Sequence, residues 1–321
     1  MQALFNNEAV QLPDVDDLLK RICLMIRGRS QKQFNKGLPV CPTETVQSLL
    51  EFGLSQLKPI NQPVVYPASR TDQGVHALCT AAHVDLVFFN DLNIYGITKL
   101  LNTFFTKHDF DIRVLSVREV PVSFSARHSV LRKKYLYRFA VVNSQALPEL
   151  PIKKNVLPIP ILEKDRCYFV PRSEFDAETA SEAASLFVGS KDFRAFMGRP
   201  SHQPNDIRTE RSIESCELRK GLPLLTTPES SCFDFYEVAC SGKSFLYRQV
   251  RRTVGVLIAV GLGRLTLDDV RGMFENPSKD SWSAKAVVVP GHGLYLTSVE
   301  YKEEDLFVEM NSFTEDSISV S

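Results

Sequence analysis

The sequence predicts an α+β protein with two ferredoxin-like halves, each following the order βαββαβ. Short apolar runs that alternate with polar residues indicate strands, and longer segments with apolar residues three or four positions apart indicate helices. From residue 18 to residue 120 these patterns follow the order strand, helix, strand, strand, helix, strand. From residue 121 the same elements recur in a similar order, with longer insertions. Two related halves of this kind would place one cleft between them.

The first half is predicted from its apolar spacing and its turn residues. The helix near residue 50 has its leucines on one face and ends before Pro59, because proline restricts the backbone of the residue that precedes it. A basic loop is expected from Gly28 to Pro42. The expected strands are 21–26, 64–66, 75–89 and 111–120, and the expected helices are 45–57 and 91–105.

The second half is predicted to carry an aromatic strand and a basic helix. Tyr135 and Tyr137 alternate along a strand that ends at residue 142, so they share one face. The longest helix is expected at 244–260, with three arginines beside its apolar face, and Thr266 with Asp269 resembles a capping box for the next helix. The other expectations are irregular segments at 143–160 and 201–205, strands at 208–218 and 232–240, helices at 176–188 and 266–274, and a last strand that ends near residue 301.

The composition is that of a globular protein. The chain has 321 residues, of which 44% are hydrophobic and 24% charged, and no apolar run reaches the roughly 18 residues typical of a membrane span. Seven cysteines form no CxxC pair, and six histidines form no HxxxH or HExxH pattern. We therefore expect no membrane association, no disulfide framework and no metal site.

The net charge of +0 conceals an uneven distribution. After Lys302 the sequence contains six acidic residues and no basic one, so the rest of the chain carries about +6. Three stretches contain basic residues and no acidic residue, namely 18–43, 120–148 and 238–267. Each could be an ordinary solvated face, but three together favour a surface that binds a polyanion.

One turn holds the strongest candidate for chemistry. Asp72 lies between two apolar runs, two residues after Arg70 and two before Gly74, whose backbone freedom suits a sharp turn. Taken alone, Arg70 and Asp72 are more simply explained as a structural ion pair in a hairpin loop. A buried carboxylate beside an arginine is ionised at neutral pH and can act as a nucleophile or an electrostatic stabiliser. Motifs of the GxSxG, GxxxxGK[ST] and GxGxxG types are absent.

Tyr135 and Arg251 are the companion candidates. A tyrosine can stack on a nucleobase or take part in proton transfer, and the competing interpretation of Tyr135 is a cross-strand aromatic pair. Arg251 has the competing interpretation of a phosphate contact or a surface ion pair. An aspartic hydrolase built on Asp72 would need a second carboxylate that shares a proton with the first, and no second matching loop exists.

Seven segments in order resemble the TruA-type family of tRNA pseudouridine synthases, over roughly residues 20–301. The family signature stands here as Arg70-Thr71-Asp72-Gln73-Gly74-Val75-His76-Ala77. Two further family segments stand as Phe124-Ser125-Ala126-Arg127 followed by Lys133-Lys134-Tyr135-Leu136-Tyr137, and as the run from Phe245 to Gly255 that contains Arg251. The remaining matches are Thr45-Val46-Gln47 with Leu50-Glu51, the run from Lys191 to Phe196, Ile207-Arg208-Thr209, and the run from His292 to Leu296.

This resemblance implies a fold and a mechanism. The two halves would join in one mostly antiparallel sheet with a central RNA-binding cleft, into which the target uridine is flipped. Asp72 would be the catalytic aspartate, which attacks the ribose at C1′ or promotes loss of uracil, and the uracil would rejoin through C5. Tyr135 would pack on the base and assist proton transfer, Arg251 would pair with Asp72, and Arg70 would lie near the flipped nucleotide.

The resemblance also implies tRNA as the partner, no cofactor, and a monomer or a homodimer. The residues expected to bind RNA or substrate are Arg70, Arg127, Lys133, Lys134, Leu246, Arg248 and Arg252. The family usually has a Tyr-x-Gly loop after its first strand, whereas this sequence continues as Arg27-Gly28-Arg29. That departure leaves an alternative, a catalytically inactive tRNA-binding protein or RNA chaperone.

The expected organisation has four parts: a flexible leader at 1–17, the first half at 18–120, the second half at 121–301, and an acidic disordered tail at 302–321. Ser69-Arg70-Thr71 and the run from Ser244 to Arg252 resemble a eukaryotic branch of the family, which implies a mitochondrial location. The acidic start does not resemble a mitochondrial presequence, so a cytoplasmic or nuclear location stays open.

Overall fold

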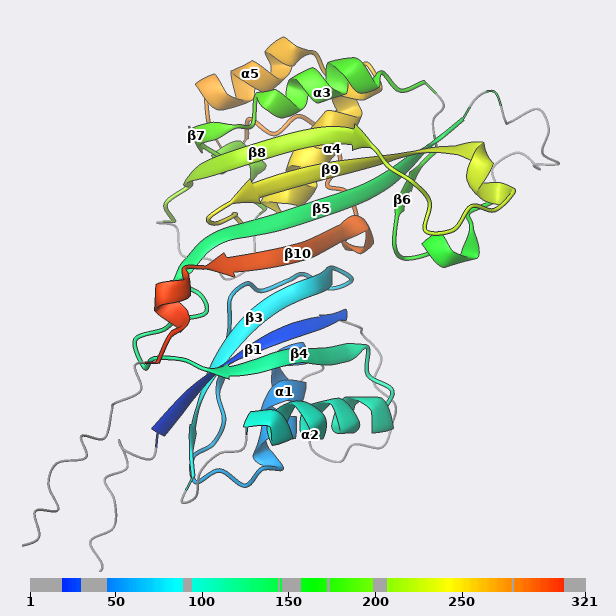
Figure 1. Cartoon of the computed structure of the whole chain (residues 1–321). Coiled ribbons are helices and arrows are strands. Elements are labelled where there is room, and N and C mark those ends of the chain that lie inside the picture. Colours follow the sequence, from blue (N-terminus) through cyan, green and yellow to red (C-terminus); the bar gives the residue numbers. More distant parts are fainter. Residues whose placement is uncertain are drawn as a thin grey trace, which may run out of the picture.

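A computed structural model describes residues 19–29, 45–88, 94–143, 145, 157–171, 174–198, 207–278 and 280–308. These residues form a mixed α+β structure with one large, mostly antiparallel sheet (Figure 1). The strands are β1 (Leu19–Arg29), β2 (Val65–Pro67), β3 (His76–Val87), β4 (Ile112–Glu119), β5 (Val130–Val142), β6 (Tyr168–Val170), β7 (Gly189–Asp192), β8 (Glu210–Lys220), β9 (Phe233–Gly242) and β10 (Leu294–Tyr301). The helices are α1 (Val46–Ser55), α2 (Ile94–Lys107), α3 (Ala177–Ser185), α4 (Gln249–Gly261) and α5 (Leu267–Glu275).

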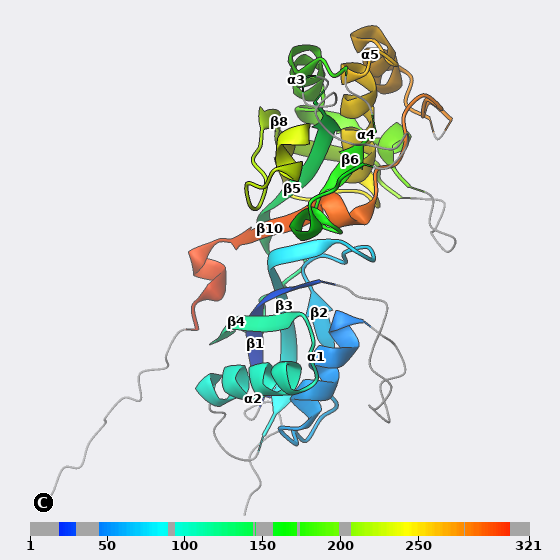
Figure 2. The same ribbon diagram turned by 90° about the vertical axis from the view of Figure 1, so that its right-hand side faces the viewer.

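The strand order along the sheet is β4-β1-β3-β10-β5-β9-β8-β7, with β2 paired to β3 and β6 paired to β5. The pairs β3–β10 and β5–β6 are parallel, and the other pairs are antiparallel. The last strand, β10, therefore lies between β3 of the first part of the chain and β5 of the second. Figure 2 shows the two parts of the sheet meeting at this strand.

The first part has its own apolar core beneath α1 and α2 (Figure 1). Thr45 caps α1 by accepting a hydrogen bond from the Ser48 N–H, which satisfies one of the donors left over at a helix start. Leu50 and Leu54 of α1 and Leu101 of α2 are buried against the strands. The spacing of these leucines is the helical periodicity of the sequence, so the two helices are confirmed.

The second part is built around α4, which is buried on nearly every side. A helix that is apolar all round belongs in the interior, and α4 packs against β5 and α3 with the largest apolar cluster around it. The segment after α5 returns across α4, and Gly255 makes this possible. A Cβ at Gly255 would lie 1.9 Å from the carbonyl oxygen of Val287, so only glycine allows this close approach.

Two parallel residue pairs join the parts, Tyr295 with His76 and Leu296 with Ala77. The rings of His76 and Tyr295 stack with centroids 4.5 Å apart. The Tyr137 hydroxyl donates to the carbonyl oxygen of Pro290 over 2.8 Å, which fixes the turn just before β10 to the centre of β5. The junction is thus made of packed aromatic side chains as well as backbone hydrogen bonds.

The structure corrects three expectations. The helix predicted at 244–260 begins at Gln249, because Arg248 has a left-handed backbone (φ 58°) that a continuous helix does not allow. It spans 13 residues against 14 for α2, so it is not the longest helix. Gly28 and Arg29 belong to β1 rather than to a loop. Two short strands, β6 and β7, were not predicted.

Other expectations fall partly outside the described residues. The leader at 1–17, the basic loop from residue 30, the polar loop at 201–205 and most of the segment 143–160 lie there. At the start of the expected acidic tail, Glu303–Leu306 forms a 3₁₀ turn, and residues 309–321 lie outside the described part. Among the described helices, none has the length and apolar character needed to cross a membrane.

The contact at Gly255 predicts a large effect of a single methyl group. Gly255→Ala would force α4 and the Val287 backbone apart, and we expect a loss of about 1 to 3 kcal/mol in the free energy of unfolding, as for other overpacked cores. Urea denaturation measures this loss. The matched control is Gly272→Ala in α5, where a Cβ meets nothing within 4 Å and helix propensity favours alanine by up to about 1 kcal/mol. Equal effects of the two substitutions would contradict the prediction.

Candidate active site

Asp72 lies in a tight turn between β2 and β3. The N–H of Val75 donates to the Asp72 carbonyl over 3.1 Å, and Gly74 takes a φ of 79°, which is why glycine suits this position. The preceding segment is fixed to the sheet, because the Ala68 N–H donates to the Ala81 carbonyl over 2.9 Å. The Asp72 side chain is 23% exposed. The turn therefore holds a partly buried carboxylate at the end of two strands.

Arg251, in the first turn of α4, is the partner of this carboxylate. Its Nη1 donates to Asp72 Oδ2 over 2.6 Å, and its Nε donates to the Val289 carbonyl over 2.7 Å. The Arg251 side chain is 13% exposed. A guanidinium held by a backbone carbonyl keeps its direction, so the charge is placed before any ligand arrives. Arg70, the arginine nearest in sequence, is exposed instead.

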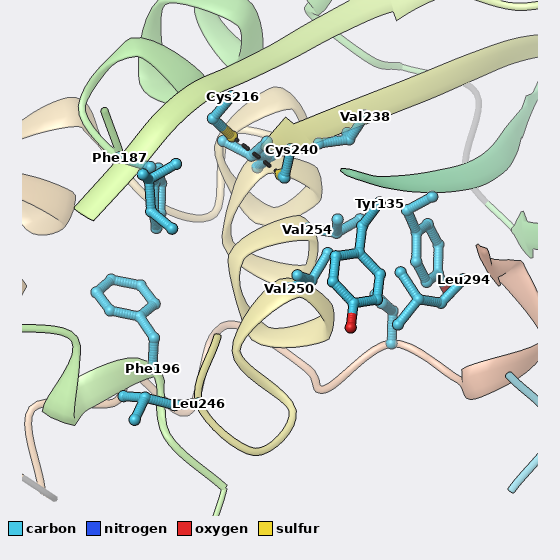
Figure 3. Packing of buried hydrophobic residues seen from close by; sticks show 14 of the residues in the cluster. Tyr135, Phe187, Phe196, Cys216, Val238, Cys240, Leu246, Val250, Val254 and Leu294 are labelled. Carbon is cyan, nitrogen blue, oxygen red and sulfur yellow. Dashed lines mark hydrogen bonds between the residues drawn. The ribbon is translucent and has the colours of Figure 1, made fainter. Parts of the chain in front are cut away.

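Tyr135 approaches the same turn from β5. Its hydroxyl lies 3.0 Å from Ser69 Oγ, and its ring meets Phe245 edge-on with centroids 5.0 Å apart. Figure 3 shows this ring beside Val250 and Val254 of α4. Burial, the largest cause, raises the pKa of the Tyr135 hydroxyl. The phenol is therefore held protonated in an apolar pocket at neutral pH.

Lys133 lies two residues before Tyr135 and faces the same way. It is 8% exposed, and its ammonium donates to the Ala68 carbonyl over 2.7 Å. Lys133 and Tyr135 thus hold the consecutive residues Ala68 and Ser69 against β5. This burial places the Lys133 ammonium away from solvent and against the Ala68 carbonyl, and the RNA contact expected of Lys133 stays a prediction.

The other predicted residues differ in their surroundings. Arg127 is exposed, Lys134 pairs with Glu300 over 2.5 Å, and Leu246 is buried in the turn before α4. Arg252 donates to the carbonyls of Ala195 and Met197 over 2.9 and 2.7 Å, and its guanidinium lies over the Trp282 ring. These contacts give Arg252 a role in packing.

Arg248 is the remaining predicted residue and lies near the carboxylate. Its Nε is 3.9 Å from Asp72 Oδ2, and its side chain is 43% exposed. Asp72, Tyr135, Arg248 and Arg251 are therefore brought together from three separate segments, namely the turn between β2 and β3, strand β5 and the start of α4. The described residues contain no cluster of three or more His, Cys, Asp or Glu side chains suited to a metal ion.

Sequence reasoning missed three supporting groups. The Val289 carbonyl, which orients Arg251, carries no signal in the sequence because every residue has a carbonyl. Ser69 could be recognised only as a polar neighbour of the signature. Gly291 lets the turn before β10 lie against Gln73, since a Cβ there would come within 2.7 Å of the Gln73 carbonyl oxygen.

A groove in the described residues lies elsewhere. It has a volume of about 560 Å³ and runs between α1 and α2, with Phe52, Leu100 and Phe104 in its lining. None of the predicted site residues lines it. Charge, hydrogen bonding and burial single out the Asp72 turn, whereas hollow shape alone singles out this groove.

The Asp72–Arg251 pair predicts a measurable coupling. A double-mutant cycle with Asp72→Ala and Arg251→Ala should give a coupling of about 1 to 3 kcal/mol in the free energy of unfolding, because both charges are partly buried and in contact. Arg208 and Glu210 form the control pair, with side chains 82% and 65% exposed. Their cycle should give a coupling within error of zero. Equal couplings would contradict this account of the pair.

Lys133 predicts a dependence of stability on pH. Burial first, and then Arg127, lower the pKa of Lys133 from 10.5 to about 8. Below pH 8 the folded and unfolded forms both hold the proton, and the folded form bears the cost of a buried charge. From about pH 8 to 10.5 the unfolded chain still binds a proton that the folded chain has released. The contribution of Lys133 to the free energy of unfolding therefore rises with pH across this range.

The comparison of wild type with Lys133→Met isolates the contribution of Lys133 to the pH dependence of the free energy of unfolding. Across this window the difference in the free energy of unfolding should move in favour of the wild type by up to about 3 kcal/mol. Chemical denaturation at several pH values measures it. Lys134→Met, on the same strand with an exposed side chain, should leave the difference flat, and a flat difference for Lys133→Met would refute the assignment.

The chain is similar to known proteins over most of its length. A family model described as tRNA pseudouridine synthase matches residues 183–302, which include Arg251. The protein tRNA pseudouridine synthase-like 1 of Homo sapiens is 37% identical over 261 residues, which cover 80% of this chain and 81% of the human protein. The protein of the same name from Mus musculus is 35% identical, with 80% and 84% covered. The tRNA pseudouridine synthase A of Bartonella henselae is 32% identical, with 80% and 90% covered.

Proposed function

The chain belongs to the tRNA pseudouridine synthase family, which isomerises uridines in tRNA, and we propose that Asp72 is its catalytic aspartate. The observation that carries this proposal is the 2.6 Å contact between Asp72 and a buried, oriented Arg251. Asp72 lies in the one turn that bears the family signature, and two other segments, β5 and the start of α4, converge on it. Both arginines approach Oδ2, so Oδ1 is the oxygen that would be directed at a substrate.

The chemistry starts at the ribose of a uridine flipped out of its stack. Asp72 attacks C1′ or promotes departure of the base, and the bond between C1′ and N1 breaks with its electron pair going to the uracil. The uracil turns within the closed pocket, and C5 forms the new bond to C1′; where Asp72 had bonded to C1′, that bond breaks and the carboxylate is regenerated. The proton on C5 is then lost, and N1 takes up a proton. The pocket keeps water from the ribose and retains the free uracil.

Tyr135 fits the position of a side chain that packs against the base. Its ring is buried among Phe245 and the apolar face of α4. A phenol whose pKa is raised is a weak proton acceptor at neutral pH. We therefore assign Tyr135 first to holding the uracil ring, with proton transfer as the lesser role. Ser69, 3.0 Å from the Tyr135 hydroxyl, orients that hydroxyl.

The proposed architecture is that of two ferredoxin-like halves. In each half the outer strands flank the first and third, and the orders β4-β1-β3-β2 and β10-β5-β9-β8 support this proposal. The proposed RNA-binding cleft lies where the halves meet, because Asp72 comes from one half and Arg251 from the other. We propose tRNA as the partner and a reaction without any cofactor, since a carboxylate, an arginine and a tyrosine supply all the groups named above.

An assay of tRNA isomerisation tests the proposal. Unmodified tRNA transcripts are incubated with the protein, and pseudouridine is mapped. Asp72→Asn keeps the size of the side chain and should lower the rate by about 1,000-fold or more, the range found when a nucleophile is removed. An Asp72→Asn protein with wild-type activity would overturn the assignment, and tight tRNA binding without any turnover would favour the inactive RNA-binding alternative.

The matched control is Asp85→Asn. Asp85 also pairs with an arginine, Arg21, over 2.5 Å, and its side chain is 28% exposed. It lies on β3, in the same half as Asp72. The Asp85→Asn protein should keep its rate, because the substitution removes a partly buried charge without touching the site. A parallel loss of rate in both variants would indicate a general effect of lost ion pairs.

A further inference from the structure

Arg248 has a backbone conformation that arginine rarely adopts. Its φ is 58° and its ψ is 12°, in the left-handed region, at the residue before α4. A residue with a Cβ is strained there because the Cβ comes close to a carbonyl oxygen, whereas glycine adopts this conformation freely. Strain of this kind persists only where the surrounding structure imposes it, and it is concentrated at functional sites.

The surrounding contacts do impose it. The Gly198 N–H donates to the Tyr247 carbonyl over 2.8 Å. The buried side chain of Gln249 accepts a hydrogen bond from the Leu246 N–H over 2.7 Å. A Cβ on Gly198 would lie 2.8 Å from the Tyr247 ring and 3.2 Å from Cδ of Arg248, so the two segments are in direct contact. The turn is fixed from both sides, and the strain cannot relax.

The Arg248 guanidinium is more exposed than that of Arg251 and makes no hydrogen bond to Asp72. Its Nε lies 3.9 Å from Asp72 Oδ2, which is too long for a hydrogen bond, and the group lies over the Tyr247 ring at 4.9 Å. Arg251, in contrast, makes a direct hydrogen bond and is tied to a carbonyl. Asp72 therefore has one buried, fixed cation and one exposed cation that is free to turn to another anion.

We propose that Arg248 binds the backbone phosphate of the uridine nucleotide that reacts at Asp72. The inference rests on the proposed function and adds a substrate contact to it. Without RNA, Arg248 lies beside Asp72 and offsets its charge. When tRNA docks, the guanidinium turns to the phosphate, whose planar, bidentate recognition suits arginine. Because that phosphate is attached to the same ribose, the contact brings C1′ to the carboxylate.

Because the backbone of Arg248 is strained, one substitution should raise the stability of the protein and lower its rate of reaction. Arg248→Gly should raise the melting temperature by about 1 to 3 °C, since glycine relieves the strain. The same variant should lower the single-turnover rate of pseudouridine formation by about 10-fold or more, because the ribose is placed less accurately. The slope of log tRNA affinity against log salt should fall by about one phosphate contact. Arg248→Lys keeps the charge, so it should keep the slope and the melting temperature.

Lys58 provides the matched control. It is an exposed basic residue with a φ of 56°, at the end of α1 and outside the site. Lys58→Gly should give a similar rise in melting temperature with the rate and salt slope of the wild type. A fall in melting temperature for Arg248→Gly would show that the side chain is structural and would overturn the inference, as would an unchanged rate and slope.

Failure of the proposed function gives a different result. If the wild-type protein makes no pseudouridine in any tRNA transcript, the proposed function fails. The salt slope still decides the inference in that case. A smaller slope for Arg248→Gly than for the wild type and Lys58→Gly supports the phosphate contact, and equal slopes for all three proteins overturn it.

Discussion

The ion pair between Asp72 and Arg251 is the contact on which the rest of the site depends. Its two residues are 179 positions apart in the chain, yet the apolar residues beside them, Val75 near Asp72 and Val250 near Arg251, belong to one cluster. They can meet only after β10 has paired with β3 on one side and with β5 on the other. The sheet therefore does more than support the site. By joining the two parts of the chain it creates the site, and neither part contains it alone.

The position of Arg251 depends on packing that carries no charge. Gly255 lets the segment around Val287 cross α4, and two residues later the Val289 carbonyl receives the Arg251 Nε. Gly291 then lets the chain touch the Asp72 turn. Taking two charges partly out of water costs hydration energy, which attraction offsets only when the geometry is good. The glycines supply that geometry, so the electrostatics of the site rest on close backbone packing.

Local patterns in the sequence were sufficient for most elements. The spacing of the leucines predicted α1. The segments that match the family, in the same order along the chain, pointed to Asp72, Tyr135 and Arg251, whose roles stay predictions. The start of α4 could not be predicted, because the residues before Gln249 suit a helix and only their contact with Gly198 forces Arg248 out of it. The strands β6 and β7 have three and four residues, which is too short for alternation to be visible.

Charge was the property that the sequence misjudged most. The sequence stretches without acidic residues suggested exposed basic faces. In the structure, acidic residues from other segments of the chain pair with several of these basic side chains. Arg132 meets Glu214 and Glu300, and Arg138 meets Glu163 in a buried pair. Within the described ranges Arg70, Arg127 and Arg248 are exposed, and Arg248 lies 3.9 Å from Asp72. We propose the phosphate contact at Arg248 because arginines paired with carboxylates have their donors engaged, whereas the Arg248 guanidinium is exposed beside Asp72.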